Sequence, residues 1–208
     1  MPSTSSKTYT KKLLTHETCW WKKLFNVQAP YRWNIRRLKP GFTLEIGCGL
    51  GRMLSHLDGH GVGIDHNKES IRIAHDKGLT AYTPDEFALS RHNKNKLFDS
   101  MLLSHVVEHL GTDASVGLIL QYKSLIKDNG QLILITPQEA GYFSDETHIE
   151  FMNFTKLQEV AVASGFQEIR HYSFPFPRFI GNIFKYNEFI SIGSLRDQKH
   201  PPTAINNF

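Results

Sequence analysis

The apolar and polar positions of this chain alternate in a way that predicts strands and helices in turn. Short apolar runs with the length of buried strands occur at residues 42–46, 61–64, 79–82, 98–103 and 131–136. The segments between them repeat apolar residues at helical spacing, which is typical of a parallel sheet with crossover helices. Two later segments, 165–174 and 187–194, predict a sixth strand and an antiparallel seventh. The pattern therefore indicates a seven-stranded, doubly wound α/β sheet with helices on both faces.

Start and stop signals place the helices between these strands. Most of the expected helices have a capping residue, a proline in the first turn, or a glycine after the last turn. The expected ranges are 31–38 after Pro30, 52–57, 68–77 after Asn67, a helix from about Asp85 towards Arg91, a long helix from Thr112 or Asp113 through Ile126, and a helix through Ser164 that opens with a Thr155–Gln158 capping box.

The stretch LEIGCGLGR, residues 44–52, changes abruptly from apolar to glycine-rich. Gly47, Gly49 and Gly51 allow the backbone to turn tightly and to come within contact distance of a ligand. A strand that ends in glycines and leads into a helix presents free amide N–H groups to a polar or anionic ligand. Glu45 argues against a pyrophosphate ligand, because a carboxylate near the loop repels phosphate but accepts hydrogen bonds from an ammonium group.

A second polar anchor follows the next strand. Asp65 ends the strand in GVGID, about 20 residues after the glycine loop, a position that suits a ribose diol. Because both strands end at the same edge of a parallel sheet, we expect a nucleoside site there.

Four segments resemble the motifs of class I S-adenosylmethionine-dependent methyltransferases: LEIGCGLG, GVGIDHN, FDSMLLSHVVEHL and LIKDNGQLILITP. One glycine loop alone commonly arises by chance, but these four occur in the family's order and spacing, from about residue 43 to residue 166. The resemblance implies a Rossmann-like fold, methyl transfer, S-adenosyl-L-methionine as cofactor and S-adenosyl-L-homocysteine as product.

The resemblance also implies cofactor contacts. Arg32, in an APYR segment, would pair with the methionine carboxylate, although Arg36 and Arg37 are rivals. Asp85, in TPDEF, would lie near the adenine amino group, with a helix N-cap as its alternative role. The full set of expected cofactor-binding residues is Arg32, Glu45, Gly47, Gly49, Asp65, His66, Asp85 and Ser104.

His148 and His105 are the candidates for catalysis. The segment SDETHIEF, residues 144–151, resembles one found in small-molecule methyltransferases such as the ubiquinone-pathway enzymes, in which the histidine lies over the active site. With an ordinary pKa of about 6.5, His148 is suited to accept a proton from a phenol or enol oxygen; the alternative is a surface histidine. His105, at the end of the fourth strand, is suited to positioning the substrate. Glu108 and His109 are interpreted as structural residues of the turn that follows, with a substrate role as the alternative.

The absence of certain motifs limits which atom is expected to accept the methyl group. No spacing of cysteines and histidines resembles a zinc site, so no metal is expected. The chain also lacks the Asn/Asp-Pro-Pro-aromatic tetrapeptide of amino-group methylation and the Pro-Cys nucleophile of cytosine methylation. These absences favour an oxygen of a small molecule as the methyl acceptor.

Length and composition predict the domain organisation of the chain and its location in the cell. A chain of 208 residues with 40% hydrophobic content can bury an ordinary core, and its two cysteines do not suggest a disulfide framework. With neither a signal peptide nor an apolar run of about 18 residues, we expect a cytoplasmic protein without a membrane span. The expected parts are a basic helical segment covering the cofactor site (1–40), a methyltransferase domain (41–196) and a mobile tail (197–208), and the oligomeric state is left open.

Charge keeps alternative functions open. The first 40 residues contain nine basic residues and only Glu17 as an acidic one, whereas the chain as a whole has a net charge of +4. This segment is interpreted either as an anion-binding face, for RNA, an acidic small molecule or a membrane surface, or as a solvated helix face. The alternatives to a small-molecule enzyme are thus an RNA methyltransferase and a catalytically silent protein that binds the cofactor and a protein partner.

Overall fold

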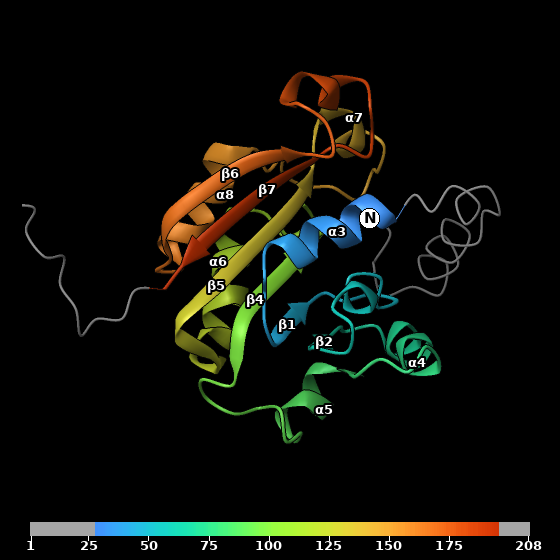
Figure 1. Ribbon diagram of the computed structural model, residues 1–208, viewed down its shortest axis with the longest axis vertical. Helices are drawn as coiled ribbons and strands as arrows, with labels where there is room; N and C mark the ends of the chain where they lie inside the picture. Colours follow the sequence, from blue (N-terminus) through green and yellow to red (C-terminus); the bar gives the residue numbers. More distant parts are fainter. Residues whose placement is uncertain (1–27, 196–208) are drawn as a thin grey trace, which may run out of the picture.

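The sheet of the computed structural model has seven strands in the order β3-β2-β1-β4-β5-β7-β6 (Figure 1). The structure describes residues 28–195. The strands are β1 (Thr43–Ile46), β2 (Gly61–Ile64), β3 (Ala81–Tyr82), β4 (Phe98–Ser104), β5 (Ile126–Pro137), β6 (Gln167–Phe174) and β7 (Glu188–Ser194). Neighbouring strands from β3 to β5 pair in parallel, and β7 pairs antiparallel with both β5 and β6. The predicted doubly wound sheet with an antiparallel seventh strand is confirmed.

Helices cover both faces of this sheet because its strands are apolar on both sides. Within β4, Met101 and Leu103 pack against one group of helices and Leu102 against the other. The helices are α3 (Ala29–Arg37), α4 (Lys68–Asp76), α5 (Pro84–Ala88), α6 (Thr112–Tyr122), α7 (Glu139–Tyr142) and α8 (Phe154–Ala163), with 3-10 turns η1 (Leu54–His56), η2 (Val107–His109), η3 (Lys123–Leu125) and η4 (Arg178–Asn182). Helices α5, α6 and α8 contribute to the first core cluster, and α3, η1 and α4 to the second.

Several helix boundaries differ from those predicted. Residues 52–57 form turns and the three-residue η1 rather than a helix. The long helix α6 ends at Tyr122, because Ile126 already belongs to β5. Helix α8 is capped by Asn153, whose side chain accepts a hydrogen bond from the Lys156 amide at 3.1 Å, so the predicted Thr155–Gln158 capping box is wrong.

Helix α3 fixes the described part of the N-terminal segment to the sheet. Its Ile35 side chain is buried in the core. The Tyr172 hydroxyl of β6 donates a hydrogen bond to Asn34 at 2.8 Å, and the Tyr31 hydroxyl donates to the Tyr186 carbonyl at 2.8 Å. Residues 1–27 of the expected basic segment and the tail 197–208 lie outside the described residues, as does Arg196.

The described helices can also be compared with the length of a bilayer span. Between residues 28 and 195, no helix is both long and apolar enough to cross a membrane.

Candidate functional site

The glycine loop after β1 has the backbone that its sequence predicts. Gly47, Gly49 and Gly51 all have positive φ, at 73°, 50° and 77°. At Gly47 a Cβ atom would lie 2.4 Å from Cγ2 of Val106, whereas at Gly49 it would meet nothing within 4 Å. The loop is thus packed tightly at its first glycine and open at its second, which leaves room for a ligand beside Gly49.

Asp65 connects this loop to the end of β2. Its Oδ2 accepts a hydrogen bond from the Gly49 amide and its Oδ1 accepts one from the Asn67 amide, both at 2.8 Å. A carboxylate oxygen has two lone pairs, so each oxygen keeps one for a ribose hydroxyl. His66 follows with an exposed ring whose Nδ1 lies 3.8 Å from Asp65 Oδ1.

Two buried polar side chains line the strand ends beside the loop. The parallel pairing of Ile46 with Leu103 places Gly47 next to Ser104. Glu45 Oε2 and Ser104 Oγ are both buried and have no hydrogen-bond partner among the described residues. Burial raises the pKa of Glu45 to about 8, with Arg52 and the Leu54 amide opposing the shift. Unsatisfied acceptors beside an open glycine loop fit a ligand that brings an ammonium group and hydroxyls.

The arginines of α3 differ in their partners. Arg36 pairs with Asp58 at 2.5 Å. The Arg37 guanidinium lies over the rings of Trp33, at 4.8 Å, and Tyr172, at 5.2 Å. In contrast, the Arg32 Nε atom is buried without a hydrogen-bond partner in residues 28–195. Of the three, Arg32 is the one with a buried N–H group left for a carboxylate in this range.

Asp85 is exposed on α5. The N-cap of that helix is Thr83, which forms a capping box with Glu86, so the alternative N-cap role for Asp85 is wrong. Helix α5 also ends at Ala88, before the expected end near Arg91.

His105 is held between two carboxylates at the end of β4. Its backbone has a φ of 57°, and its amide donates to the Ile135 carbonyl at 2.9 Å. Its Nε2 lies 2.8 Å from Glu188 Oε1 and its Nδ1 lies 3.3 Å from Glu108 Oε1. Burial by itself would lower the pKa of His105, but the two carboxylates raise it to about 9. The ring is thus an imidazolium at neutral pH, which suits positioning rather than proton removal.

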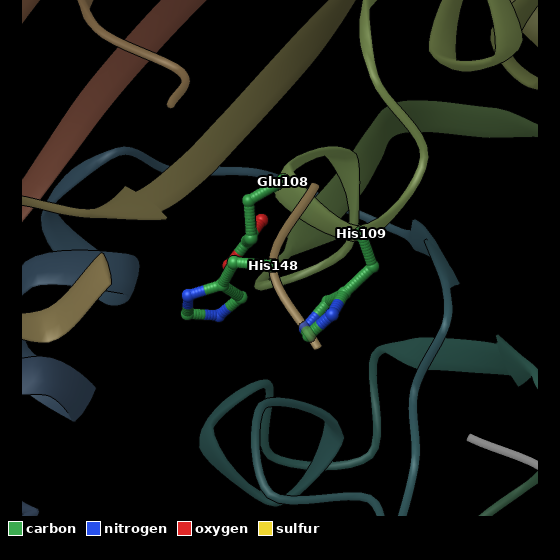
Figure 2. Close-up of side chains that lie close together, drawn as sticks. All are labelled: Glu108, His109 and His148. Carbon is green, nitrogen blue, oxygen red and sulfur yellow. The ribbon is translucent and has the colours of Figure 1, made fainter. Parts of the chain in front are cut away.

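His148 lies beside Glu108 and His109 of η2 (Figure 2). The backbone amide of Ile149 donates to the Glu108 carbonyl at 2.8 Å, which holds the two segments together. The rings of His109 and His148 have centroids 4.7 Å apart, and Tyr142 stacks on His148 at 5.2 Å. The structure thus adds Glu108 and His109 to the predicted site. Only an acid–histidine pair directly after the fourth strand signals them in the sequence.

Two hollows elsewhere on the surface involve none of the expected cofactor residues. One, of about 520 Å³, lies against Arg37, Arg170 and Tyr172. The other, of about 440 Å³, lies between α3, η1 and Asp99. The site is therefore defined by the glycine loop and the strand ends rather than by these hollows.

Comparison with known proteins decides the family. A family described as "Methyltransferase domain" matches residues 21–187. The chain belongs to this family. It is a class I methyltransferase domain whose cofactor is S-adenosylmethionine, and Gly47, Gly49, Asp65 and Ser104 present the groups that fit it.

Relatives and solved structures agree with this assignment. An uncharacterized methyltransferase of Alkaliphilus oremlandii is 30% identical over 122 residues, which cover 57% of this chain and 55% of that protein. The chain thus spans about half the length of that relative. A SAM-dependent methyltransferase from Archaeoglobus fulgidus has the same fold with a TM-score of 0.62 and 18% identity, over 79% of this chain and 92% of that one. A SAM-dependent methyltransferase from Thermotoga maritima, described as a possible histamine N-methyltransferase, has a TM-score of 0.64 and 16% identity. The match covers 91% of this chain and 98% of that one.

Proposed function

We propose that the methyltransferase transfers a methyl group to a hydroxyl oxygen of a small, partly apolar molecule. S-adenosylmethionine supplies a methyl group already activated on a sulfonium, so the chain has to align the acceptor and remove its proton. Gly47, Gly49 and Asp65 would hold the nucleoside, and Glu45 and Arg32 the amino acid end. Ser104 would contact the cofactor through its backbone. His66 and Asp85 stay predictions from the resemblance.

The observation that carries the choice of oxygen is the histidine cluster beside β4. His148 Nδ1 lies 2.6 Å from the Tyr142 carbonyl, which can only accept a hydrogen bond. In the neutral imidazole, Nδ1 therefore carries the proton and Nε2 keeps a lone pair. A lone pair at this position supports loss of a proton from a hydroxyl, whereas a neutral amine has its own lone pair and needs no such help.

Exposed apolar side chains around the cluster support an apolar acceptor. Phe143 and Ile149 directly flank the segment that carries His148 and are 79% and 62% exposed. Phe179 and Ile183, from the segment between β6 and β7, are also exposed. That segment contacts α7 through Arg178, whose guanidinium pairs with Glu139 (Figure 1). Apolar side chains around a few polar groups are typical of small-molecule sites.

The RNA alternative gains no support from the described residues. Arg36 and Arg37 belong to the basic segment but already have partners within the chain. The lysines at 7, 11, 12, 22 and 23 lie outside the described residues.

The test is a methyl-transfer assay with labelled S-adenosylmethionine. Phenols, enols, matched amines and structured RNA would be offered separately, and the modified atom identified by mass spectrometry. We expect label on a phenol or enol oxygen, and about a 100-fold or greater loss of turnover in His148→Ala with S-adenosylhomocysteine affinity kept. Label on the amines or the RNA alone, or equal turnover in the variant, would contradict the proposal.

A further inference from the structure

Three side chains of the site form a group with the composition of a metal centre. Glu108, His109 and His148 each offer one ligand atom, and these atoms all lie within 4.8 Å of one another (Figure 2). Two imidazoles and one carboxylate are a donor set that divalent transition metals commonly use.

Both histidines are oriented as metal ligands are. His109 Nδ1 lies 3.1 Å from the Thr147 carbonyl, as His148 Nδ1 does from the Tyr142 carbonyl at 2.6 Å. Each carbonyl fixes the proton on Nδ1, so both Nε2 atoms keep their lone pairs. Metal-binding histidines usually donate their other N–H group to a carbonyl or carboxylate in this way.

The Glu108 carboxylate supplies an independent indication of a ligand. The residue is fully buried, and neither of its oxygens accepts a hydrogen bond from any residue between 28 and 195. His105 Nδ1 faces Oε1 at 3.3 Å, which leaves Oε2 without a charged or polar partner in that range. The His105 imidazolium compensates the charge of Glu108 from the Oε1 side only. A buried carboxylate oxygen with no hydrogen bond is costly, and a cation at the cluster would compensate for it at Oε2.

The ligands are also held in place before any ion binds. The Ile149 amide is hydrogen-bonded to the Glu108 carbonyl, which fixes His148 opposite η2. On the next residue, Glu150 accepts hydrogen bonds from the Thr112 amide at 2.7 Å and from the Thr112 hydroxyl at 3.1 Å. Two elements distant in sequence are thereby locked around the cluster.

We propose that Glu108, His109 and His148 bind one divalent transition-metal ion, such as Zn²⁺, Mn²⁺ or Fe²⁺. Three protein ligands leave coordination positions open, and a hydroxyl of the methyl acceptor would take one of them. This second part rests on the proposed function.

In that arrangement the ion lowers the pKa of the acceptor hydroxyl. The O–H bond breaks and its proton passes to solvent. The oxygen lone pair then forms the bond to the methyl carbon, and the electrons of the S–CH3 bond stay on sulfur. The lone pair of His148 Nε2 binds the ion in this arrangement, so His148 promotes loss of the hydroxyl proton through the ion and does not accept that proton itself.

The direct test measures metal binding without methyl transfer. Tag-free protein is stripped with chelator, saturated with S-adenosylhomocysteine and titrated with Co²⁺, Mn²⁺ and Zn²⁺, following calorimetry and the visible absorption of Co²⁺. We expect one ion per chain, with binding weakened about tenfold or more in Glu108→Gln and in His148→Gln. His60→Ala, which removes an exposed histidine, is the matched control and should bind as the wild type does.

Absence of stoichiometric binding, or wild-type affinity in both cluster variants, would overturn the metal site. Affinity for S-adenosylhomocysteine shows that each variant is folded, and His148→Gln alone suffices if the buried Glu108→Gln does not fold. A bound ion with no methylated hydroxyl would contradict the proposed function and leave the metal site standing. If chelator-stripped protein methylates a hydroxyl as fast as metal-loaded protein, the proposed function stands but the role of the ion in it is overturned.

Discussion

At the scale of single residues, Asp65 has two tasks. Its carboxylate holds the glycine loop through Gly49 and the start of α4 through Asn67, and we expect its remaining lone pairs to accept from the ribose hydroxyls. The residue is 9% exposed, so its hydrogen bonds compete little with water.

The Asp65→Ala variant should bind S-adenosylhomocysteine more weakly by about 1–3 kcal/mol, because hydrogen bonds to a charged group are lost. Calorimetry measures the affinity. A thermal unfolding curve shows whether the weaker binding comes from a destabilised glycine loop or only from the lost hydrogen bonds to the ligand. Asp76→Ala is the matched control, since Asp76 is exposed and pairs with Arg72. Equal affinity in the two variants would place the nucleoside elsewhere.

Glu45 should couple cofactor binding to pH. Burial raises its pKa to about 8, so the unliganded protein holds this carboxyl largely protonated at pH 7. An ammonium group beside it favours the ionised form, so binding should release a proton, and affinity should rise from pH 6 to pH 8. Calorimetry with S-adenosylhomocysteine in buffers of different ionisation enthalpy measures the release. A Glu45→Gln variant should bind S-adenosylhomocysteine without releasing a proton. If that variant releases as many protons as the wild type, Glu45 is not the source of the released proton.

At the scale of elements, the glycine loop depends on close packing against the segment after β4. Gly47 combines a φ of 73° with a hypothetical Cβ 2.4 Å from Val106. A side chain there would strain the backbone and push apart the ends of β1 and β4.

The Gly47→Ala variant should therefore lose about 2–4 kcal/mol of unfolding free energy, the combined cost of a left-handed alanine and of overpacking. Gly59→Ala serves as the control, since Gly59 has a φ of 81° with open space around it and should lose only about 1–2 kcal/mol. Denaturant unfolding measures both. Equal losses would mean that Val106 moves aside freely.

Most elements follow from local pattern. Apolar runs mark the buried strands, and Asn67 caps α4 as predicted, accepting hydrogen bonds from the Glu69 and Ser70 amides. The pattern fails where two local signals compete. Asn153 and Thr155 are both good N-cap residues, and only the extended backbone of Asn153, with a ψ of 179°, decides between them. Ile126 fits the helical repeat but pairs with Phe98 as the first residue of β5.

The sequence predicts which site residues lie close together at the ends of neighbouring strands, but not which residues meet through loop contacts. Gly47 and Asp65 directly follow parallel strands and Ser104 is the last residue of one, so their proximity is a consequence of the sheet. The contact of His148 with η2 depends on a backbone hydrogen bond between residues about 40 positions apart, which no local pattern records. The sequence alone therefore indicates turn residues at Glu108 and His109.

At the scale of the whole molecule, a buried histidine should set the acid limit of stability. His56 is 3% exposed and lies near Arg52, Arg32 and Arg36; burial first, and then these charges, lower its pKa to about 4. Between pH 6.5 and pH 4, His56 therefore stays neutral in the folded protein but is protonated in the unfolded chain.

Between pH 6.5 and pH 4 this difference should remove up to about 3 kcal/mol of unfolding free energy, and the stability should be fully present above pH 6.5. Denaturant unfolding across this range measures the slope. A His56→Gln variant should show a shallower slope than the wild type, because glutamine does not titrate. An identical slope in both proteins would assign the acid sensitivity to other groups.

The central claim is that the edge of the sheet formed by Gly47, Gly49 and Asp65 binds an adenosyl amino acid. Calorimetric titration of the wild-type protein with S-adenosylmethionine, S-adenosylhomocysteine and NAD tests it most directly. We predict binding of both adenosyl ligands at one site per chain, and none of NAD, because the pyrophosphate of NAD carries no ammonium group to pair with Glu45. Binding of NAD, or of none of the three, would contradict the account.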